Sequence, residues 1–361
     1  MEFALSEQQI LMQQSVDGVL KRACPLERVR RFADNGEPHA HDIWHQLAQL
    51  GIAGLVIPEQ YGGMGLGILE AALVAESLGR VVAPVPFIGA AVMAPLALMK
   101  AGTVRQRDHW LPHLASGKKT IGVALSEFGG STREGAGIAA SNGKLSGKAL
   151  FAIDFAEARA FMVADRNGRL YLIDSEAPGL TTRTLPTIDR TRSFGELKLH
   201  HVEAESLHDD HGAAPRICNI GRVLLAADTL GAGGAMIDKA VAYAKERKQF
   251  GRVIASFQAV KHLCAEMVAQ LEPGRALVWY AAYALDHRPD EAPLVAAHAK
   301  AYLGDAGRFV ARTATEVHGG IGITDMLGLH YWYKRIGANR PLLGTPERMR
   351  EAAARIHGFV G

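Results

Sequence analysis

The chain has 361 residues, of which 48% are hydrophobic and 21% are charged, and its formal net charge is +3. This length can bury a large core and is typical of two or three structural units. The charge is mild, and no dense block of lysines and arginines interleaves with aromatic residues, which argues against nucleic-acid binding. A slightly basic surface of this kind suits a polyanionic small molecule.

Other classes of protein are also disfavoured. The three cysteines (Cys24, Cys218 and Cys264) are far apart and form no CxxC pair, so neither a disulfide framework nor a metal site is predicted, and buried apolar roles are expected. No apolar run approaches the ~20 residues that span a bilayer. The N-terminal residues lack the layout of a signal peptide. The sequence therefore predicts a cytoplasmic protein without a membrane span.

Residues 1–117 are predicted to form a helical domain. Apolar residues recur at helical spacing in EQQILMQQSVDGVLKRA, HDIWHQLAQLG, ILEAALVAESLGRV and GAAVMAPLALMKAG. The intervening PEQYGGMG favours a structural turn in which Gly62 and Gly63 adopt positive φ.

Residues 118–214 are predicted to form a β domain, and residues 215–361 a second helical domain. The middle region contains the short strand-like segments TIGVALSE, GKLSGKALFAI, ARAFMVAD, RLYLID and FGELKLHHV, with DRNGR as a hairpin turn. Long helical patterns return after Cys218, and no internal repeat or low-complexity tract is present. The predicted fold class is α+β, with the order helices, strands, helices.

Four sequence blocks together resemble the acyl-CoA dehydrogenase family. They are LAQLGIAGLVIPEQYGGMGLG, ALSEFGGS, AYAKERKQFGRVIASFQAVKHLCAEM and EVHGGIGITD. The blocks follow the family's order and spacing and cover nearly the whole chain. The block from Arg247 to Gln258 is the most specific, whereas the HGGxG turn alone is weak.

The resemblance implies a three-domain fold and a flavin chemistry. It implies an N-terminal α-helical domain, a β-barrel-like middle domain and a C-terminal four-helix bundle, assembled as a homo- or heterotetramer (a dimer of dimers). FAD would lie between the β domain of one subunit and the bundle of its neighbour. The substrate would be an acyl-CoA that loses an α-proton and a β-hydride, with an electron-transferring flavoprotein as acceptor.

The resemblance implies a set of cofactor contacts. Several of these residues could instead have ordinary structural roles. Arg247 suits a phosphate and Phe250 a ring edge, although a solvated arginine is common where a helix ends, here expected at Gly251. The glycines after Ser126 could form an ordinary loop, and Gly319 could be a helix cap. The predicted contacts are Ser126, Ser131, Arg247, Phe250, Gln258, Glu316, Gly319, Gly320 and Thr345.

The chain lacks a glutamate at the positions where the family has its catalytic base. Of the two positions where the family carries its catalytic glutamate, one is Leu343, before Gly344, and the other is Gly221. Neither side chain can accept a proton. Glu316 stands where the family tends to have a glutamine near the phosphates of FAD, and a carboxylate there faces a like charge. Phe151 is the nearest match to the tryptophan that shields the flavin.

Three interpretations remain open. The first is a catalytically incomplete subunit that pairs with an active paralogue, as in heterotetrameric acyl-CoA dehydrogenases acting on steroid side chains. The second is a homomeric enzyme whose base is Asp228, Asp325 or Glu127, although surface or capping roles are expected for the two aspartates. The third is a non-enzymatic protein that binds an acyl-CoA or another protein.

Overall fold

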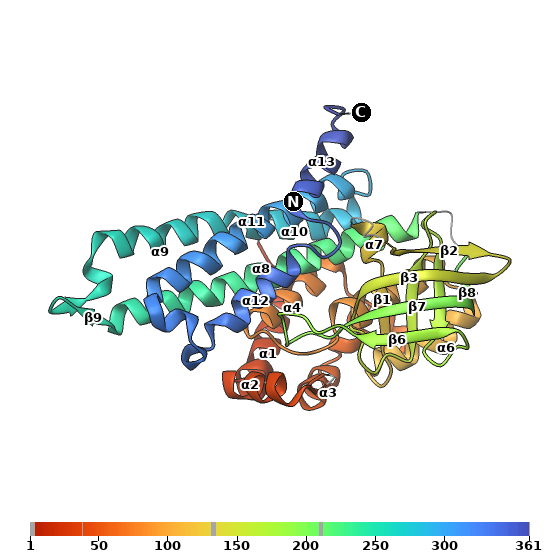
Figure 1. The fold of residues 1–361 in the computed structure, drawn as a ribbon, viewed down its shortest axis with the longest axis horizontal. Coiled ribbons are helices and arrows are strands. Elements are labelled where there is room, and N and C mark those ends of the chain that lie inside the picture. The colour runs from red at the N-terminus through yellow and green to blue at the C-terminus, as the bar shows by residue number, and fades with distance from the viewer. Residues whose placement is uncertain (1–3, 38, 131–134, 209–211, 361) are drawn as a thin grey trace.

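The computed structural model describes residues 4–37, 39–130, 135–208 and 212–360, which form three parts in chain order (Figure 1). A group of helices is followed by a β-sheet and then by long helices. The sheet lies at one end of the long helices, and the hairpin that contains β9 (Lys248–Gln249) lies at the other end. The predicted order of helices, strands and helices is confirmed.

The N-terminal part is helical, as predicted. Its first helix begins where the sequence provides a capping box, because Ser6 Oγ accepts from Gln9 N (3.2 Å) and Gln9 Oε1 accepts from Ser6 N (2.9 Å). The helices are α1 (Glu7–Ala23), α2 (Leu26–Asn35), α3 (His41–Gln49), α4 (Ile68–Arg80), α5 (Ala94–Ala101) and α6 (Val104–Ala115), with short η1 (Ile52–Gly54), η2 (Glu59–Tyr61) and η3 (Ile88–Met93).

The turn between α3 and α4 is structural, but its two glycines act differently. Gly62 has the expected positive φ of 84°. Gly63 does not, and a Cβ added there would lie 2.0 Å from the Ile57 carbonyl oxygen. Gly63 is therefore required by close backbone approach rather than by a left-handed conformation.

The middle part is an eight-stranded sheet within the described residues, ordered β6-β7-β3-β1-β4-β5-β8, with β2 paired to β3. The predicted DRNGR hairpin is confirmed, because Asp165 Oδ1 accepts from the amides of Asn167 and Arg169, both at 2.9 Å. The elements are β1 (Ile121–Ala124), α7 (Ser126–Gly129), β2 (Gly137–Ser141), β3 (Lys144–Ile153), β4 (Ala160–Ala164), β5 (Leu170–Asp174), β6 (Leu180–Thr184), β7 (Phe194–Glu203) and β8 (Glu205–Ser206).

The C-terminal part is a helical bundle in which α8, α9, α10 and α11 pack on one another. A small hairpin connects α8 to α9, and α13 projects at the C-terminal end (Figure 1). The elements are α8 (Ala213–Glu246), β9 (Lys248–Gln249), β10 (Arg252–Val253), η4 (Ile254–Ser256), α9 (Gln258–Leu271), α10 (Pro273–His287), α11 (Ala292–His318), η5 (Gly319–Ile323), η6 (Asp325–Leu327), α12 (Leu329–Asn339) and α13 (Pro346–Ile356).

Helix α8 corrects one expectation from the sequence. It is long and apolar enough to cross a membrane by length and composition, although no apolar run of that length was recognised. In the structure 89% of its most apolar window is buried inside the protein. Helix α8 is therefore a core helix.

The joint between α4 and α8 depends on two glycines. A Cβ on Gly79 would lie 2.1 Å from the carbonyl oxygen of Asp228, and one on Gly231 would lie 1.9 Å from that of Glu76. Backbone meets backbone at both points, so no side chain fits there. This contact joins the N-terminal and C-terminal helices into one hydrophobic core.

Candidate active site

The two positions where a catalytic base was expected, Leu343 and Gly221, lie against each other. Gly221 is buried in α8, and a Cβ added to it would lie 2.4 Å from Leu343 Cδ1 and 2.8 Å from Met93 Sδ. Leu343 lies in the loop between α12 and α13 and is 1% exposed. The apolar side chains of Leu343 and Met93 therefore fill the space into which either base would project.

Arg222 holds the loop that carries Leu343. Its Nε donates to the Leu343 carbonyl (2.9 Å), and its Nη2 donates to the Gly129 carbonyl (2.6 Å). Burial lowers the pKa of the guanidinium, which stays charged because arginine titrates far above neutrality. Leu343 has a φ of 57°, a strained value for leucine that the arginine clamp helps to maintain. The sequence marked Arg222 only as a neighbour of Gly221, so its positioning role was missed.

Two predicted cofactor contacts lie around this apolar centre, and their side chains already have partners. Ser126, at the start of α7, is buried and its Oγ donates to the Phe151 carbonyl (3.1 Å). Thr345 caps α13, where its Oγ1 accepts from the Arg348 amide (3.4 Å). Ser131 lies outside the described residues.

Phe151, the nearest match to the flavin-shielding tryptophan, has its ring in edge-to-face contact with Phe194, with centroids 6.4 Å apart. It sits at an irregularity of β3 and has a φ of 55°. Nearby, Cys218 is 1% exposed, as predicted for a buried apolar group, and burial raises the pKa of its thiol to about 11.

A basic hollow of about 380 Å³ opens beside α7. Lys148 from β3, Arg166 from the β4–β5 turn and Arg348 from α13 line it, together with Glu127 and Asp165. Three cations from three elements can receive a phosphate-bearing group. These three cations could not be predicted from the sequence, because they come from distant segments without a shared motif.

The most specific sequence block forms an exposed hairpin at the far end of the bundle. Arg247 caps the C-terminus of α8, and Phe250 is 93% exposed. The prediction that Gly251 ends the helix is wrong, because Phe250 (φ 54°) and Gly251 (φ 75°) form the two-residue turn between β9 and β10. Two successive positive φ values are those of a type I′ hairpin turn.

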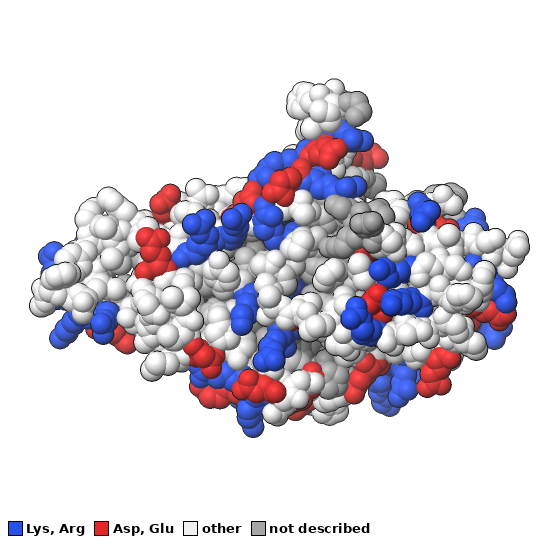
Figure 2. All heavy atoms as spheres, in the orientation of Figure 1, with Lys and Arg blue, Asp and Glu red and all other residues white. Residues whose placement is uncertain are grey.

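The remaining predicted contacts lie near this hairpin end. Gln258 begins α9 and is exposed, with its Nε2 3.0 Å from His262 Nε2. Gly319 ends α11 with a φ of 63°, which supports the helix-cap interpretation. Gly320 and Glu316 are exposed, and a Cβ on Gly320 would meet nothing within 4 Å. Figure 2 shows that uncharged side chains cover much of this end of the molecule.

The predicted cofactor contacts therefore fall into two groups at opposite ends of one helix. Gly221 and Glu246 are both in α8, and a rise of ~1.5 Å per residue separates them by roughly 38 Å. Side chains at the two ends of α8 are too far apart to contact the same flavin ring. If both groups contact flavin, one of them must belong to a second chain.

The acids considered as alternative bases are engaged in structural contacts. Asp228 is not on the surface, as its pattern suggested, but is 1% exposed, with its carboxylate 2.7 Å from Arg192 Nη2 and 3.1 Å from Arg335 Nη1. Asp325 is exposed, and its hydrogen bond with His330 lowers the pKa of its carboxyl, which weakens it as a base. Glu127 Oε2 accepts from the Leu150 amide (3.1 Å).

Comparison with known proteins covers almost the whole chain. Residues 6–118 match the model of the acyl-CoA dehydrogenase N-terminal domain, and residues 213–357 match that of the C-terminal domain. Acyl-CoA dehydrogenase IpdE2 of Mycolicibacterium smegmatis is 31% identical over 355 residues, covering 98% of this chain and 100% of the relative.

Solved structures agree with these matches. The ChsE4-ChsE5 complex of Mycobacterium tuberculosis has a chain with 26% identity and a TM-score of 0.91, and the match covers 100% of both chains. The Tcur3481-Tcur3483 steroid acyl-CoA dehydrogenase has 29% identity and a TM-score of 0.89, covering 98% of each chain. The predicted fold and the predicted resemblance to steroid-degrading subunits are both confirmed. This chain belongs to the acyl-CoA dehydrogenase family of FAD-dependent oxidoreductases.

Proposed function

We propose that this chain is an FAD-binding subunit for the α,β-dehydrogenation of an acyl-CoA thioester, that it lacks a catalytic base of its own, and that it pairs with an active paralogue. The observation that carries the proposal is the contact between Leu343 and Gly221, which leaves apolar atoms at both positions where the family keeps its base. We further propose a cytoplasmic location, an electron-transferring flavoprotein as electron acceptor, and domains 1–117, 118–214 and 215–361.

The residues present fit FAD held between two chains. At the hairpin end, Arg247 is an exposed guanidinium suited to a phosphate, and the 93% exposed ring of Phe250 can cover a flat aromatic group. Gln258, Gly319 and Gly320 would add contacts there, and Ser126 and Thr345 would serve the cofactor bound at the other end. When bound, FAD would accept the electrons of dehydrogenation.

The remaining roles of this chain are positioning and binding. Lys148, Arg166 and Arg348 would hold the phosphates of coenzyme A in the basic hollow. Leu343 and Met93 would keep water out of the apolar centre. At the two base positions, an α-proton would meet only carbon and sulfur among the atoms that the structure describes. Proton removal would take place in a half-site whose base comes from the paralogue.

Glu316 fits less well than the glutamine common in the family. It is exposed on α11, so its carboxylate can stay in water, but a flavin phosphate brought close to it would meet a like charge. This charge would weaken the flavin contact at the hairpin end, whereas Arg247 at the same end would favour the phosphate. The intact hairpin block supports the proposal that this chain still holds the flavin of its neighbour's active site.

A homomeric enzyme with a relocated base is the second candidate. It would need Asp228, Asp325 or Glu127 to move a proton. The buried ion pairs of Asp228 with Arg192 and Arg335 argue against it, because a carboxylate tied to two guanidinium groups is a weak base.

The test is the flavin content and the mass of the chain, purified alone and after coexpression with paralogues of the same family. We expect poor turnover of acyl-CoA by the chain alone and a stable flavin-containing tetramer with the correct paralogue. A homotetramer with one FAD per chain and fast dye reduction would establish the homomeric enzyme instead. A mixed tetramer that holds no flavin would establish the non-enzymatic interpretation.

Arg247→Ala tests the hairpin contact. A charge-assisted hydrogen bond contributes about 1.5–3 kcal/mol, so the variant should lose flavin on dialysis by a factor of at least ten while its helical circular dichroism is unchanged. Lys245→Ala is the matched control, since it removes another exposed cation from the last turn of the same helix. Equal flavin retention by the two variants would remove Arg247 from the site.

A further inference from the structure

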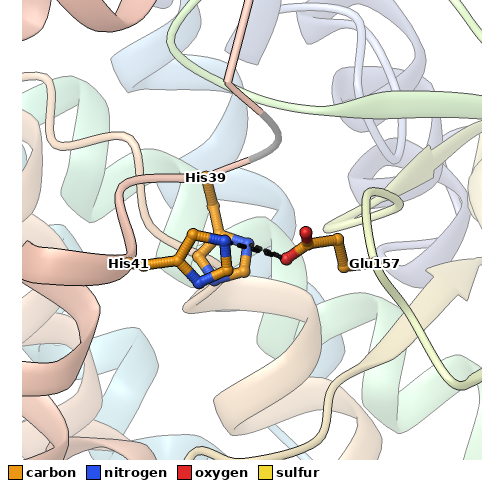
Figure 3. Close-up of side chains that lie close together, drawn as sticks. All are labelled: His39, His41 and Glu157. Carbon is orange, nitrogen blue, oxygen red and sulfur yellow. Dashed lines mark ion pairs between the residues drawn. The ribbon is translucent and has the colours of Figure 1, made fainter.

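A second site candidate lies where the N-terminal helices meet the sheet. His39 lies in the connection between α2 and α3, and His41 is the first residue of α3. Glu157 lies in the connection between β3 and β4. Their side chains converge from two sides, as Figure 3 shows. None of these residues belongs to a block that carries the family resemblance, and all lie apart from Leu343.

The distances among the three side chains suit a small metal ion. Glu157 Oε2 is 3.4 Å from His39 Nδ1 and 3.1 Å from His41 Nε2. One ligand atom from each residue lies within 4.8 Å of the other two. A tetrahedral zinc ion with bonds of ~2.0–2.1 Å requires ligand atoms ~3.3 Å apart. The carboxylate oxygen already has this separation from both imidazoles.

His39 Nδ1 provides an independent indication. This atom is buried and has no hydrogen-bond partner, because its contact with Glu157 lacks hydrogen-bond geometry. An unpaired buried polar atom costs about 1–3 kcal/mol unless a missing partner satisfies it.

The backbone around Glu157 also holds it in place. Glu157 has a φ of 57°, which is unusual for a residue with a side chain, and its carbonyl accepts from Thr120 Oγ1 (3.4 Å). Such strained conformations concentrate at ligand sites, where the surrounding structure maintains them. The carboxylate is about half exposed, and its Oε2 lies beside both histidines.

We propose that His39, His41 and Glu157 form a binding site for a divalent transition-metal ion, Zn²⁺, which ties the N-terminal helices to the sheet. Two imidazoles and one carboxylate are a ligand set that suits zinc better than Mg²⁺ or Ca²⁺, which prefer oxygen ligands. The fourth position faces a hollow of about 710 Å³. Lys118 and Arg159 also line this hollow, so its fourth ligand is water or an anion.

The experiment measures zinc binding by untagged protein from which metals have been removed. Equilibrium dialysis against ZnCl₂ with elemental analysis should give one tight Zn²⁺ per chain, and excess MgCl₂ should not displace it. His41→Ala and Glu157→Gln should each weaken binding at least tenfold. Both side chains are about half exposed or more, so the variants should fold. His45→Ala is the matched control, because it removes a third histidine of the same hollow.

A second readout is thermal unfolding. Zn²⁺ should raise the unfolding temperature of the native chain and of His45→Ala, because a ligand that binds the folded state stabilises it, and should leave Glu157→Gln unchanged. The proposal would be overturned by weak zinc uptake, by more than one ion per chain, or by equal uptake in the native chain and the three variants. Scattered surface histidines would explain each of these results. Retention of full affinity by His41→Ala or Glu157→Gln would overturn it as well. Flavin and acyl-CoA play no part in either measurement.

Discussion

Replacing Leu343 by glutamate should create the base that this subunit lacks. Leu343 is 1% exposed, and its Cδ1 would lie 2.4 Å from a Cβ added to Gly221. A substrate proton would have to be removed in this apolar centre. A positioned base contributes about 10²–10⁴ in rate, which at ~1.4 kcal/mol per decade is roughly 3–5 kcal/mol of activation free energy. Leu343→Glu should therefore raise acyl-CoA turnover by this factor in any half-site that holds flavin.

The surroundings determine whether the new carboxyl can act at neutral pH. Full burial raises a carboxyl pKa by up to ~3–5 units, and a nearby guanidinium lowers it by ~1–3 units. Arg222 is that guanidinium, because its Nε is 2.9 Å from the carbonyl oxygen of residue 343. Burial is the larger effect, so the pKa of the new carboxyl should lie above the ordinary value for glutamate, which favours a general base. Loss of the leucine from the core costs about 2–5 kcal/mol, which a protein with 5–15 kcal/mol of stability can survive.

The assay is dye reduction with a panel of acyl-CoA thioesters, performed on protein whose flavin content has been measured. Leu343→Gln is the control, because it has the size of glutamate and cannot accept the proton. If the glutamate and glutamine variants turn over equally, the reasoning about the base is refuted. Fast turnover by the native chain, abolished by Asp228→Asn, would refute it too and identify Asp228 as the base.

Three further outcomes concern stability. Gly231→Ala should lower the unfolding free energy by at least 1–3 kcal/mol, because its methyl would lie 1.9 Å from a carbonyl oxygen of α4. The control is Gly18→Ala in α1, which should be neutral or stabilising. Urea titration measures the unfolding free energy of both variants. Arg335→Met should cost about 3–5 kcal/mol in the same assay, because it leaves buried Asp189 without its partner at 2.8 Å, and a loss below 1 kcal/mol would contradict this. In metal-free protein, burial lowers the pKa of His39 from 6.5 to about 4, so as the pH falls through 6.5 the unfolded chain binds the proton and the folded chain does not. Acidification from pH 6.5 to 4 should therefore cost about 1–3 kcal/mol that His39→Gln does not lose; parallel pH profiles of the two proteins would exclude it.

The sequence predicted those features that depend on neighbours along the chain. The hairpin at DRNGR is a local hydrogen-bond pattern, and it is found in the structure. The order of helices and strands was also readable, because apolar periodicity changes where the architecture changes. The turn at Phe250 and Gly251 was misread because a glycine after a basic helical segment also fits a helix C-cap.

Features that depend on distant segments could not be predicted. The sequence pattern put Asp228 on a surface, whereas Arg335 and Arg192 approach it from a later helix and from a loop of the sheet domain. The need for glycine at position 231 likewise arises only where α4 crosses α8. His39 and Glu157 are 118 positions apart by number, so no motif could connect them. Tertiary contact created each of these constraints.

The packing of the apolar centre links its two base positions, because the side chain at position 343 limits which residue fits at position 221. A side chain at position 221 would begin 2.4 Å from Leu343 Cδ1 and 2.8 Å from Met93 Sδ, so a glutamate there requires the ends of both side chains to move within a buried centre. A leucine at position 343 thus removes one base and crowds the other. Gly221→Glu alone should produce less activity than Leu343→Glu, which replaces a side chain that already occupies this space. The asymmetry between these two substitutions follows from sterics in this chain, and it would be absent if the centre were an open cavity.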